Sequence, residues 1–365
     1  MAALPPPFVG GGRMPDRLVD LATGNPDVVL LPPLEPALRM INTSHVMYGD
    51  HGVDPALARF AAAEFEADDV AAQAIAVTGG ALDAIERILR EYLRAGDRIG
   101  VEDPGDAAVV ELALASALVP TAIAVDEAGP RPDAFEEALR NGSRAVIVTP
   151  RAHNPTGAAI TEERGTQLSR ILRRFPDVAV IEHDGAAVVA GAPVVRVRGA
   201  PHAPWAFVRS TSKFLGPDLR IAVVAGDEIT IARVASRQAL GVRWVSHVVQ
   251  RLAMALWSDP ANGRRFARAA ELYGARRQAL RAALAARGIQ SSGGSGLNVW
   301  LPVLEESAIV HGLAERGWAV AAGERFRLQS RPAVRITIST LDPADAVRLA
   351  EDLAAVIRPS RAAMA

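Results

Sequence analysis

Short, unbroken apolar runs alternate with amphipathic stretches over most of the chain. A strand with one solvated face alternates apolar and polar side chains, whereas a strand covered on both faces is apolar throughout. The pattern therefore predicts an α/β fold, with a mostly parallel sheet and helices on both faces. The predicted strands are residues 74–78, 98–102, 121–125, 145–149, 178–182, 205–209 and 221–225, and the predicted helices are residues 54–65, 79–90, 106–117, 131–139 and 161–174.

The last third of the chain has a different pattern. One long arginine-rich helix is predicted at residues 260–287, followed by strands at 297–301, 319–321 and 333–339 and a helix at 343–358. This order is typical of a smaller α+β domain. We therefore predict an N-terminal arm at residues 1–45, a large domain at 46–258 and a small C-terminal domain at 259–365.

Composition and charge exclude several classes of protein. Half of the residues are hydrophobic, 22% are charged and the formal net charge is −1, so no overall field favours nucleic acid or an anionic membrane. The chain has no cysteine, which removes disulfides and thiolate chemistry. No apolar run approaches the ~20 residues that span a bilayer, and the Pro- and Gly-rich residues 1–13 do not form a signal peptide. We expect a cytoplasmic protein without a nucleic-acid or membrane partner.

Lysine 213 stands out because the 40 basic residues are 39 arginines and this one lysine. A surface charge or an ion pair accepts either residue, but a nucleophilic amine must lose its proton, which guanidinium does not. A lysine that forms a Schiff base explains the exception. Chance survival in an arginine-biased coding sequence is the alternative.

Polar residues follow the predicted strands, where ligands bind in sheets of this type. Two glycines, Gly79 and Gly80, stand between a strand and a helix, an arrangement that points backbone N–H groups at an anion. A turn-rich segment near the N-terminus contains Gly24 and Asn25, which bring backbone close to a ligand. The residues that lie just past strands are Gly79, His153, Asn154, His183, Asp184, Ser210 and Lys213.

Five motifs resemble those of the fold-type-I pyridoxal 5′-phosphate (PLP) enzymes of the class I and II aminotransferase group. Within that group, the sequence is most similar to the aminotransferase-like domain of MocR-type regulators. The similarity extends from about residue 20 to about residue 349. The motifs are AVTGGALDAIE (76–86), EDPG (102–105), TPRAHNPTG (149–157), STSKFLGPDLR (210–220) and VRITIS (334–339).

The resemblance implies a role for each matching residue. Lys213 would hold PLP as the internal aldimine and move the proton during catalysis. Asn154 would bind the ring oxygen, and Arg335 would bind the substrate carboxylate near Gly24 and Asn25. Tyr48 would reach the phosphate of a neighbouring subunit, which implies a homodimer with shared sites. The remaining cofactor-binding positions are Gly79, Gly80, Ala81, Ser210, Ser212 and Arg220 around the phosphate, and Asp106, His183 and Asp184 around the ring; no metal is implied.

The sequence departs from the family pattern around the ring. His183 aligns with the aspartate that usually faces the pyridine nitrogen, although a shift by one residue would restore Asp184. Asp106 occupies the position of an aromatic residue that often stacks on the ring, and Gly185 replaces another frequent aromatic or histidine. These changes suggest that the PLP ring withdraws electrons to a different extent than in most family members. The alternative is that Asp184 takes the usual position beside the pyridine nitrogen.

Three functions remain open on the sequence alone. The first is an aminotransferase, in specialised metabolism. The second is a PLP enzyme for elimination, replacement or C–C bond formation on an electrophilic amino acid such as S-adenosylmethionine. The third is an effector-sensing domain without turnover. The DNA-binding domain of MocR regulators is not found upstream in this sequence, which we expect to weaken the third.

Overall fold

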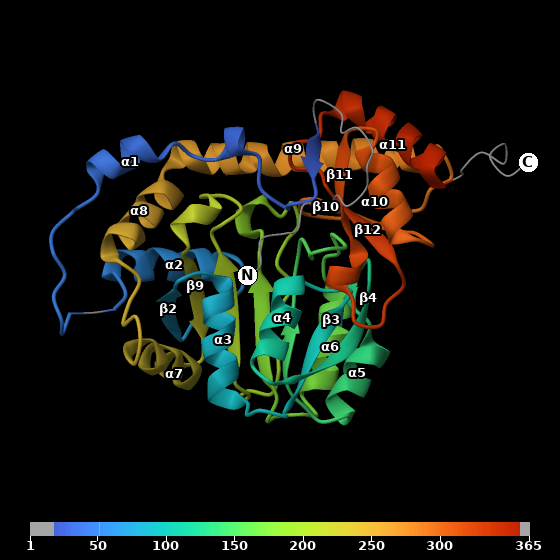
Figure 1. Ribbon diagram of the computed structural model, residues 1–365. Helices are drawn as coiled ribbons and strands as arrows, with labels where there is room; N and C mark the ends of the chain where they lie inside the picture. The colour runs from blue at the N-terminus through green and yellow to red at the C-terminus, as the bar shows by residue number, and fades with distance from the viewer. Residues whose placement is uncertain (1–17, 51, 358–365) are drawn as a thin grey trace, which may run out of the picture.

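The computed structural model describes residues 18–50 and 52–357 and contains a central eight-stranded sheet, which is drawn in Figure 1. The strand order is β2-β9-β8-β7-β6-β3-β4-β5, with parallel pairing from β8 to β4 and antiparallel pairing at β9, β2 and β5. The strands are β2 (Ala74–Thr78), β3 (Arg98–Asp103), β4 (Val119–Asp126), β5 (Gly129–Pro130), β6 (Ser143–Val148), β7 (Ala179–Asp184), β8 (Trp205–Ser210) and β9 (Ala222–Gly226). The predicted mostly parallel sheet is confirmed.

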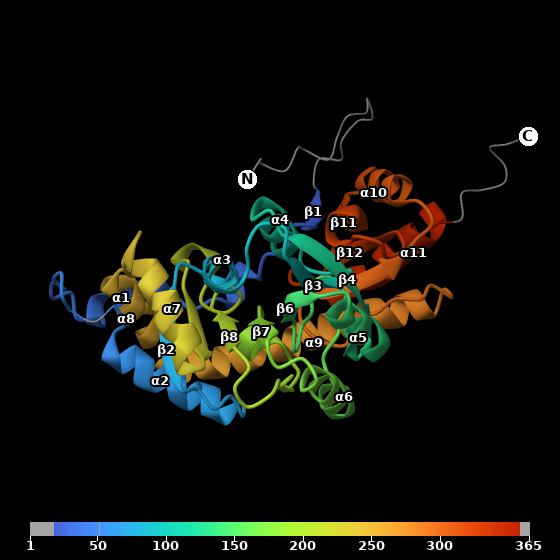
Figure 2. The same ribbon diagram turned by 90° about the horizontal axis from the view of Figure 1, so that it is seen from below.

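Helices cover both faces of this sheet, as the view from below shows (Figure 2). Apolar side chains of α3, α4 and α7 form one buried cluster with the sheet, and those of α2, α5, α6, α8 and α9 pack on the opposite face. The helices are α2 (Pro55–Ala67), α3 (Ala81–Tyr92), α4 (Ala107–Ala115), α5 (Pro132–Arg140), α6 (Glu162–Leu172), α7 (Glu228–Ala239), α8 (His247–Ser258) and α9 (Pro260–Ala285). This double cover explains why the central strands are apolar at successive positions.

Local signals in the sequence set the starts of several helices. The carboxylate of Asp54 accepts from Ala56 N at 2.9 Å at the start of α2, where Pro55 takes the first helical position. Asp106 caps α4 in the same way through Ala108 N at 3.0 Å. Both use the unpaired N–H groups of the first helical turn, which side-chain oxygens normally satisfy. Asp106 is therefore fixed at the carboxyl edge of the sheet, just after β3.

A second sheet of four strands lies beside the first, in the order β1-β11-β12-β10. Its strands are β1 (Val19–Leu21), β10 (Asn298–Pro302), β11 (Trp318–Ala322) and β12 (Ala333–Thr337), and helices α10 (Glu306–Ala314) and α11 (Pro343–Ile357) pack with it. β1 comes from the N-terminal arm and pairs parallel with β11. The N-terminal chain then continues through α1 (Leu34–Met40), which packs against α8, so this segment links the four-stranded sheet with the helices of the eight-stranded sheet (Figure 1).

The three-part division of the chain stays a prediction, and its segments 1–17 and 358–365 lie outside the described residues. Among the described residues, no helix has the length and apolar character needed to cross a membrane.

Candidate functional site

Lys213 lies in the turn that follows β8, and its neighbours anchor it firmly. Phe214 and Leu215 are buried in the main apolar cluster, and Thr211 Oγ1 donates to Ile221 O at 2.9 Å. The Lys213 ammonium donates to the carbonyl of Gly24 at 2.7 Å. Burial and, secondly, the charge of Arg335 lower the pKa of Lys213 below its usual 10.5, against an opposing effect of Asp106. A lowered pKa makes the amine available as a nucleophile nearer to neutral pH.

The glycine turn before α3 lies against Arg220. Gly80 has φ +110°, and a Cβ built there would lie 2.7 Å from Arg220 Nη2. Ser210 and Ser212 belong to the same motif as Arg220, and their hydroxyl oxygens are 3.0 Å apart. The N-cap of α3 is Gly80, so no side-chain oxygen from that position satisfies the N–H groups of the first turn, which begins at Ala81. The N–H of Gly79 is different, because it donates to Asp83 Oδ2 at 2.9 Å.

Arg335 on β12 brings the small sheet to the same place. Its Nη1 donates to Asn154 Oδ1 at 3.0 Å and its Nη2 to the carbonyl of Ala22, whereas its buried Nε has no partner among the described residues. Burial lowers the pKa of Arg335 to about 10, and the charge of Asp106 acts in the opposite direction. Asn154 Oδ1 is occupied by this contact, so its amide N–H₂ group remains to bind a ligand.

The N-terminal segment passes directly over Lys213 and Arg335. Besides the two carbonyl contacts above, a Cβ on Gly24 would lie 3.2 Å from Arg335 Nη2, and Asn25 O accepts from Ser339 Oγ at 2.6 Å. Gly24 has φ +74°, a backbone conformation that glycine adopts without strain. The backbone of Gly24 thus lies beside both basic side chains, and the carbonyl of Asn25, the next residue, is held by Ser339.

His183 and Asp184 point to opposite faces of the sheet, because successive side chains of a strand alternate. His183 shares the face of Ile181, which packs in the cluster with α3 and α4, whereas Val180, on the face of Asp184, packs with α5 and α6. His183 is 9% exposed, and its ring has no hydrogen bond to any other described residue.

Asp184 has other partners. Its carboxylate accepts from Arg151 at 2.9 and 3.0 Å and from Arg209 Nε at 3.0 Å, and Asp68 pairs with the same two arginines. Burial by itself raises the pKa of Asp184, but the guanidiniums of Arg151 and Arg209 outweigh it and hold this pKa below its usual value. The Asp184 carboxylate therefore lies on the face of the sheet opposite to His183, where Arg151 and Arg209 bind it. The sequence did not predict that Arg151 and Arg209 are buried at this place, although Arg151 lies within the motif at residues 149–157.

Tyr48 does not lie with the other expected site residues in the single chain. It is 78% exposed, its ring packs edge-on against Trp244 at 5.7 Å between centroids, and the Arg243 guanidinium lies 5.0 Å from its ring. Gly185 lies next to His183, since a Cβ on Gly185 would be 3.5 Å from His183 Nε2. Among the described residues, no group of His, Asp or Glu side chains is arranged to hold a metal ion.

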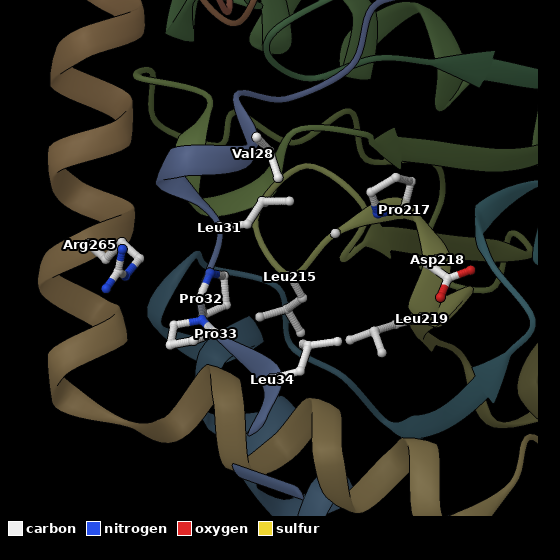
Figure 3. A pocket seen from close by; sticks show the side chains of 11 residues that line it. Val28, Leu31, Pro32, Pro33, Leu34, Leu215, Pro217, Asp218, Leu219 and Arg265 are labelled. Atoms are coloured by element: carbon white, nitrogen blue, oxygen red, sulfur yellow. The ribbon is translucent and has the colours of Figure 1, made fainter. Parts of the chain in front are cut away.

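A groove of about 570 Å³ lies just beyond the Lys213 turn (Figure 3). Most of its wall is apolar, with Val28, Leu31 and Leu34 from the N-terminal segment and Leu215 and Leu219 after the lysine. Two charged residues, Asp218 and Arg265, also line it. This groove lies beside the site and shares the Lys213 turn with it.

A model of the class I and II aminotransferase family matches residues 18–353. The chain belongs to this family. It is 40% identical to the vitamin B6 salvage pathway transcriptional repressor PtsJ of Salmonella typhimurium, over 95% of this chain and 81% of PtsJ. The fold is shared with Pyrococcus horikoshii kynurenine aminotransferase (TM-score 0.83, 20% identity, 94% of this chain and 91% of that chain) and with the multiple substrate aminotransferase of Thermococcus profundus (TM-score 0.84, 20% identity, 94% and 92%).

PLP is the cofactor of this family, and the residues present fit it. Gly80 leaves room beside Arg220 that a Cβ would fill, which suits a phosphate close to the backbone and next to a guanidinium. The amine of Lys213 has a lowered pKa, as a residue that attacks a carbonyl carbon requires. The His183 ring makes no hydrogen bond to another described residue and lies at the end of the central strand β7.

Proposed function

We propose that this chain is a PLP-binding sensing domain, which holds PLP through Lys213 and an α-amino acid through Arg335 and is built for binding rather than rapid turnover. The proposal is supported by the similarity to PtsJ, a repressor of vitamin B6 salvage, along nearly the whole chain. The observation that carries it is the pair His183 and Asp184. The face of the strand that would meet the ring carries an imidazole, while the neighbouring carboxylate is held by two arginines on the other face.

PLP, when bound, supplies a carbonyl carbon that reacts with amines and a ring that withdraws electrons. The guanidinium of Arg220, the hydroxyl of Ser210 and the first turn of α3 would hold its phosphate. The amide of Asn154 would donate to the ring oxygen. Arg335 would take the ligand carboxylate in place of the carbonyl of Ala22, which it contacts here, and a guanidinium binds a carboxylate bidentately.

His183 weakens electron withdrawal by the ring. A carboxylate beside the pyridine nitrogen favours its protonated form, because opposite charges a few ångströms apart attract. A neutral imidazole accepts the same hydrogen bond but brings no negative charge. Lys213, Asn154, Arg335 and the residues proposed for the phosphate are therefore kept, while the carboxylate that favours a protonated ring is replaced by His183.

An aminotransferase is the second candidate, because Lys213, Asn154 and Arg335 are all kept. The experiment that separates the two incubates the PLP-bound protein with a panel of L- and D-amino acids and follows the cofactor by mass spectrometry. A sensing domain changes its absorption spectrum with a subset of amino acids yet keeps the aldehyde form of PLP over hours. Conversion to the amine form at about 1 s⁻¹ or faster, the rate of ordinary enzymes, would overturn the sensing proposal.

The variant His183→Asp gives the matched comparison. If the imidazole limits turnover, this substitution speeds conversion of the cofactor to its amine form by at least tenfold relative to the parent. An unchanged slow rate means that some other feature limits turnover and removes the observation on which the proposal rests.

We also propose a homodimer with sites built by both chains. Apolar side chains are exposed along the N-terminal segment and near Tyr48, among them Val29 (76%), Met40 (84%) and Met47 (66%). Exposed apolar side chains of this kind are typical of association surfaces, and Val28, which lines the groove in Figure 3, is next to Val29 in the chain. Tyr48 would then reach the partner's PLP phosphate. Mixing a Lys213→Ala chain with a Tyr48→Phe chain should restore PLP binding to one site per dimer, and a monomer in sedimentation would contradict the proposal.

A further inference from the structure

Asp106 and His183 come from different elements but line one small cavity. Asp106 is the N-cap of α4, just after β3, whereas His183 lies near the end of β7, two strands from β3 in the order of the sheet. The cavity between them has a volume of about 10 Å³, room for one water molecule. Its other polar lining groups are Glu102 and Thr149, and the rest of the wall is valine and isoleucine.

Glu102 is already occupied by other partners. Its two carboxylate oxygens accept from Thr149 N at 2.9 Å and Thr149 Oγ1 at 2.6 Å, and His153 Nε2 lies 3.3 Å from it. Asp106, in contrast, uses only Oδ1, for Ala108 N, and makes no ion pair within the described residues. One carboxylate oxygen of Asp106 is therefore available to the cavity.

His183 needs a partner at this place. The His183 side chain is only 9% exposed, and its ring makes no hydrogen bond to another described residue, so a partner at this place would fix its tautomer. The negative charge of Asp106 acts on Lys213 and Arg335 and by itself raises the pKa of each. Asp184, the carboxylate next in sequence to His183, is on the other face of the sheet and bound to arginines. Glu102 and Asp106 are the two acidic residues that line the cavity with His183. Because Thr149 occupies both oxygens of Glu102, Asp106 is the acidic group that remains available to His183.

We propose that Asp106 is a positioning residue for His183: its carboxylate accepts the hydrogen of one imidazole nitrogen, directly or through one water, and leaves the lone pair of the other nitrogen for the pyridine N–H of PLP. The pair then replaces the single carboxylate that the family usually places there. Carboxylates fix the tautomer of histidines in this way in other sites. The inference rests on the proposed PLP site, and it adds which residue orients the ring partner.

The test uses nitrogen NMR of the cofactor-free protein with ¹⁵N-labelled histidine, at a pH where imidazole is neutral. His183→Gln identifies the His183 signals among the seven histidines. We expect a single fixed tautomer in the parent. Asp106→Ser keeps a good helix cap but is too short to reach His183, so the two ring nitrogens should become an averaged mixture.

Asp106→Asn keeps both the cap and an acceptor oxygen, so it should restore the single tautomer. Glu102→Gln is the control from the same cavity and should leave the parent pattern unchanged. An averaged His183 signal in the parent, or a parent-like pattern in Asp106→Ser, overturns the proposal, as does loss of the fixed tautomer in Glu102→Gln alone.

A second measurement follows PLP binding. Loss of one hydrogen bond at the ring should weaken PLP binding about 5- to 10-fold in Asp106→Ser, and Asp106→Asn should recover most of this loss. The NMR experiment requires no cofactor, so a parent protein that fails to bind PLP would contradict the proposed function and leave the Asp106–His183 result to be judged separately.

Discussion

Alanine in place of Gly80 should damage phosphate binding through a contact that the structure defines. The added Cβ would lie 2.7 Å from Arg220 Nη2 and 3.2 Å from its Cζ. These distances are shorter than real Cβ contacts, so one of the two groups must move. Arg220 is long and exposed, and its guanidinium will move before the backbone does. The cost then falls on the group that would hold the phosphate.

Two separate magnitudes follow from this geometry. Alanine at φ +110° strains the backbone by about 1–3 kcal/mol, which lowers the free energy of unfolding. Displacement of Arg220 removes a hydrogen bond between charged groups, worth about 1.5–3 kcal/mol. This second term appears only in the affinity for PLP and corresponds to a roughly 10- to 100-fold weaker Kd.

Gly142→Ala is the matched control, because Gly142 has φ +88° and no heavy atom lies within 4 Å of the position that a Cβ would take there. Urea unfolding should show a similar loss of stability in Gly80→Ala and Gly142→Ala. Fluorescence titration should show weaker PLP binding in Gly80→Ala alone. Pyridoxal, which lacks the phosphate, should bind both variants equally. If PLP binds Gly80→Ala as tightly as it binds Gly142→Ala, Arg220 does not hold the phosphate as we describe.

Three further substitutions test other parts of the site. Lys213→Arg keeps the charge but should abolish covalent attachment of PLP, so borohydride reduction should add the mass of the cofactor to the parent only, on the peptide that contains residue 213. Arg335→Gln removes a charge that lowers the pKa of Lys213; this pKa should rise, and the rate of PLP attachment, followed by absorbance, should reach its midpoint at higher pH. Asp184→Asn leaves Arg151 and Arg209 without their buried carboxylate and should lower the free energy of unfolding by about 3–5 kcal/mol at pH 7. Because the folded-state pKa of Asp184 is depressed, its contribution is present above the usual 3.8 and is lost as the pH falls through the lower folded-state value, so the difference between variant and parent should shrink in strong acid.

Local patterns in the sequence were sufficient for most of the large domain. The apolar runs at residues 74–78 and 205–209 begin where β2 and β8 begin, and the capping residues Asp54 and Thr161 stand at the N-caps of α2 and α6. These features depend on neighbours within a few positions, which is why a linear pattern reveals them. Helices α1, α7, α8 and α10 are not among the elements that the pattern predicts.

The sequence by itself also determined the chemistry that is possible, because a single lysine among 39 arginines lies in a motif with Ser210 and Arg220. Only the tertiary structure decided how these groups are surrounded. It brought the carbonyl of Gly24 to Lys213 and that of Ala22 to Arg335, across separations of 189 and 313 residues. It also turned His183 toward α4 and Asp184 toward two arginines. Motif spacing cannot distinguish neighbours on a strand, because a shift of one residue reverses the face of every side chain, and the face that is buried against each helix depends on the assembled sheet.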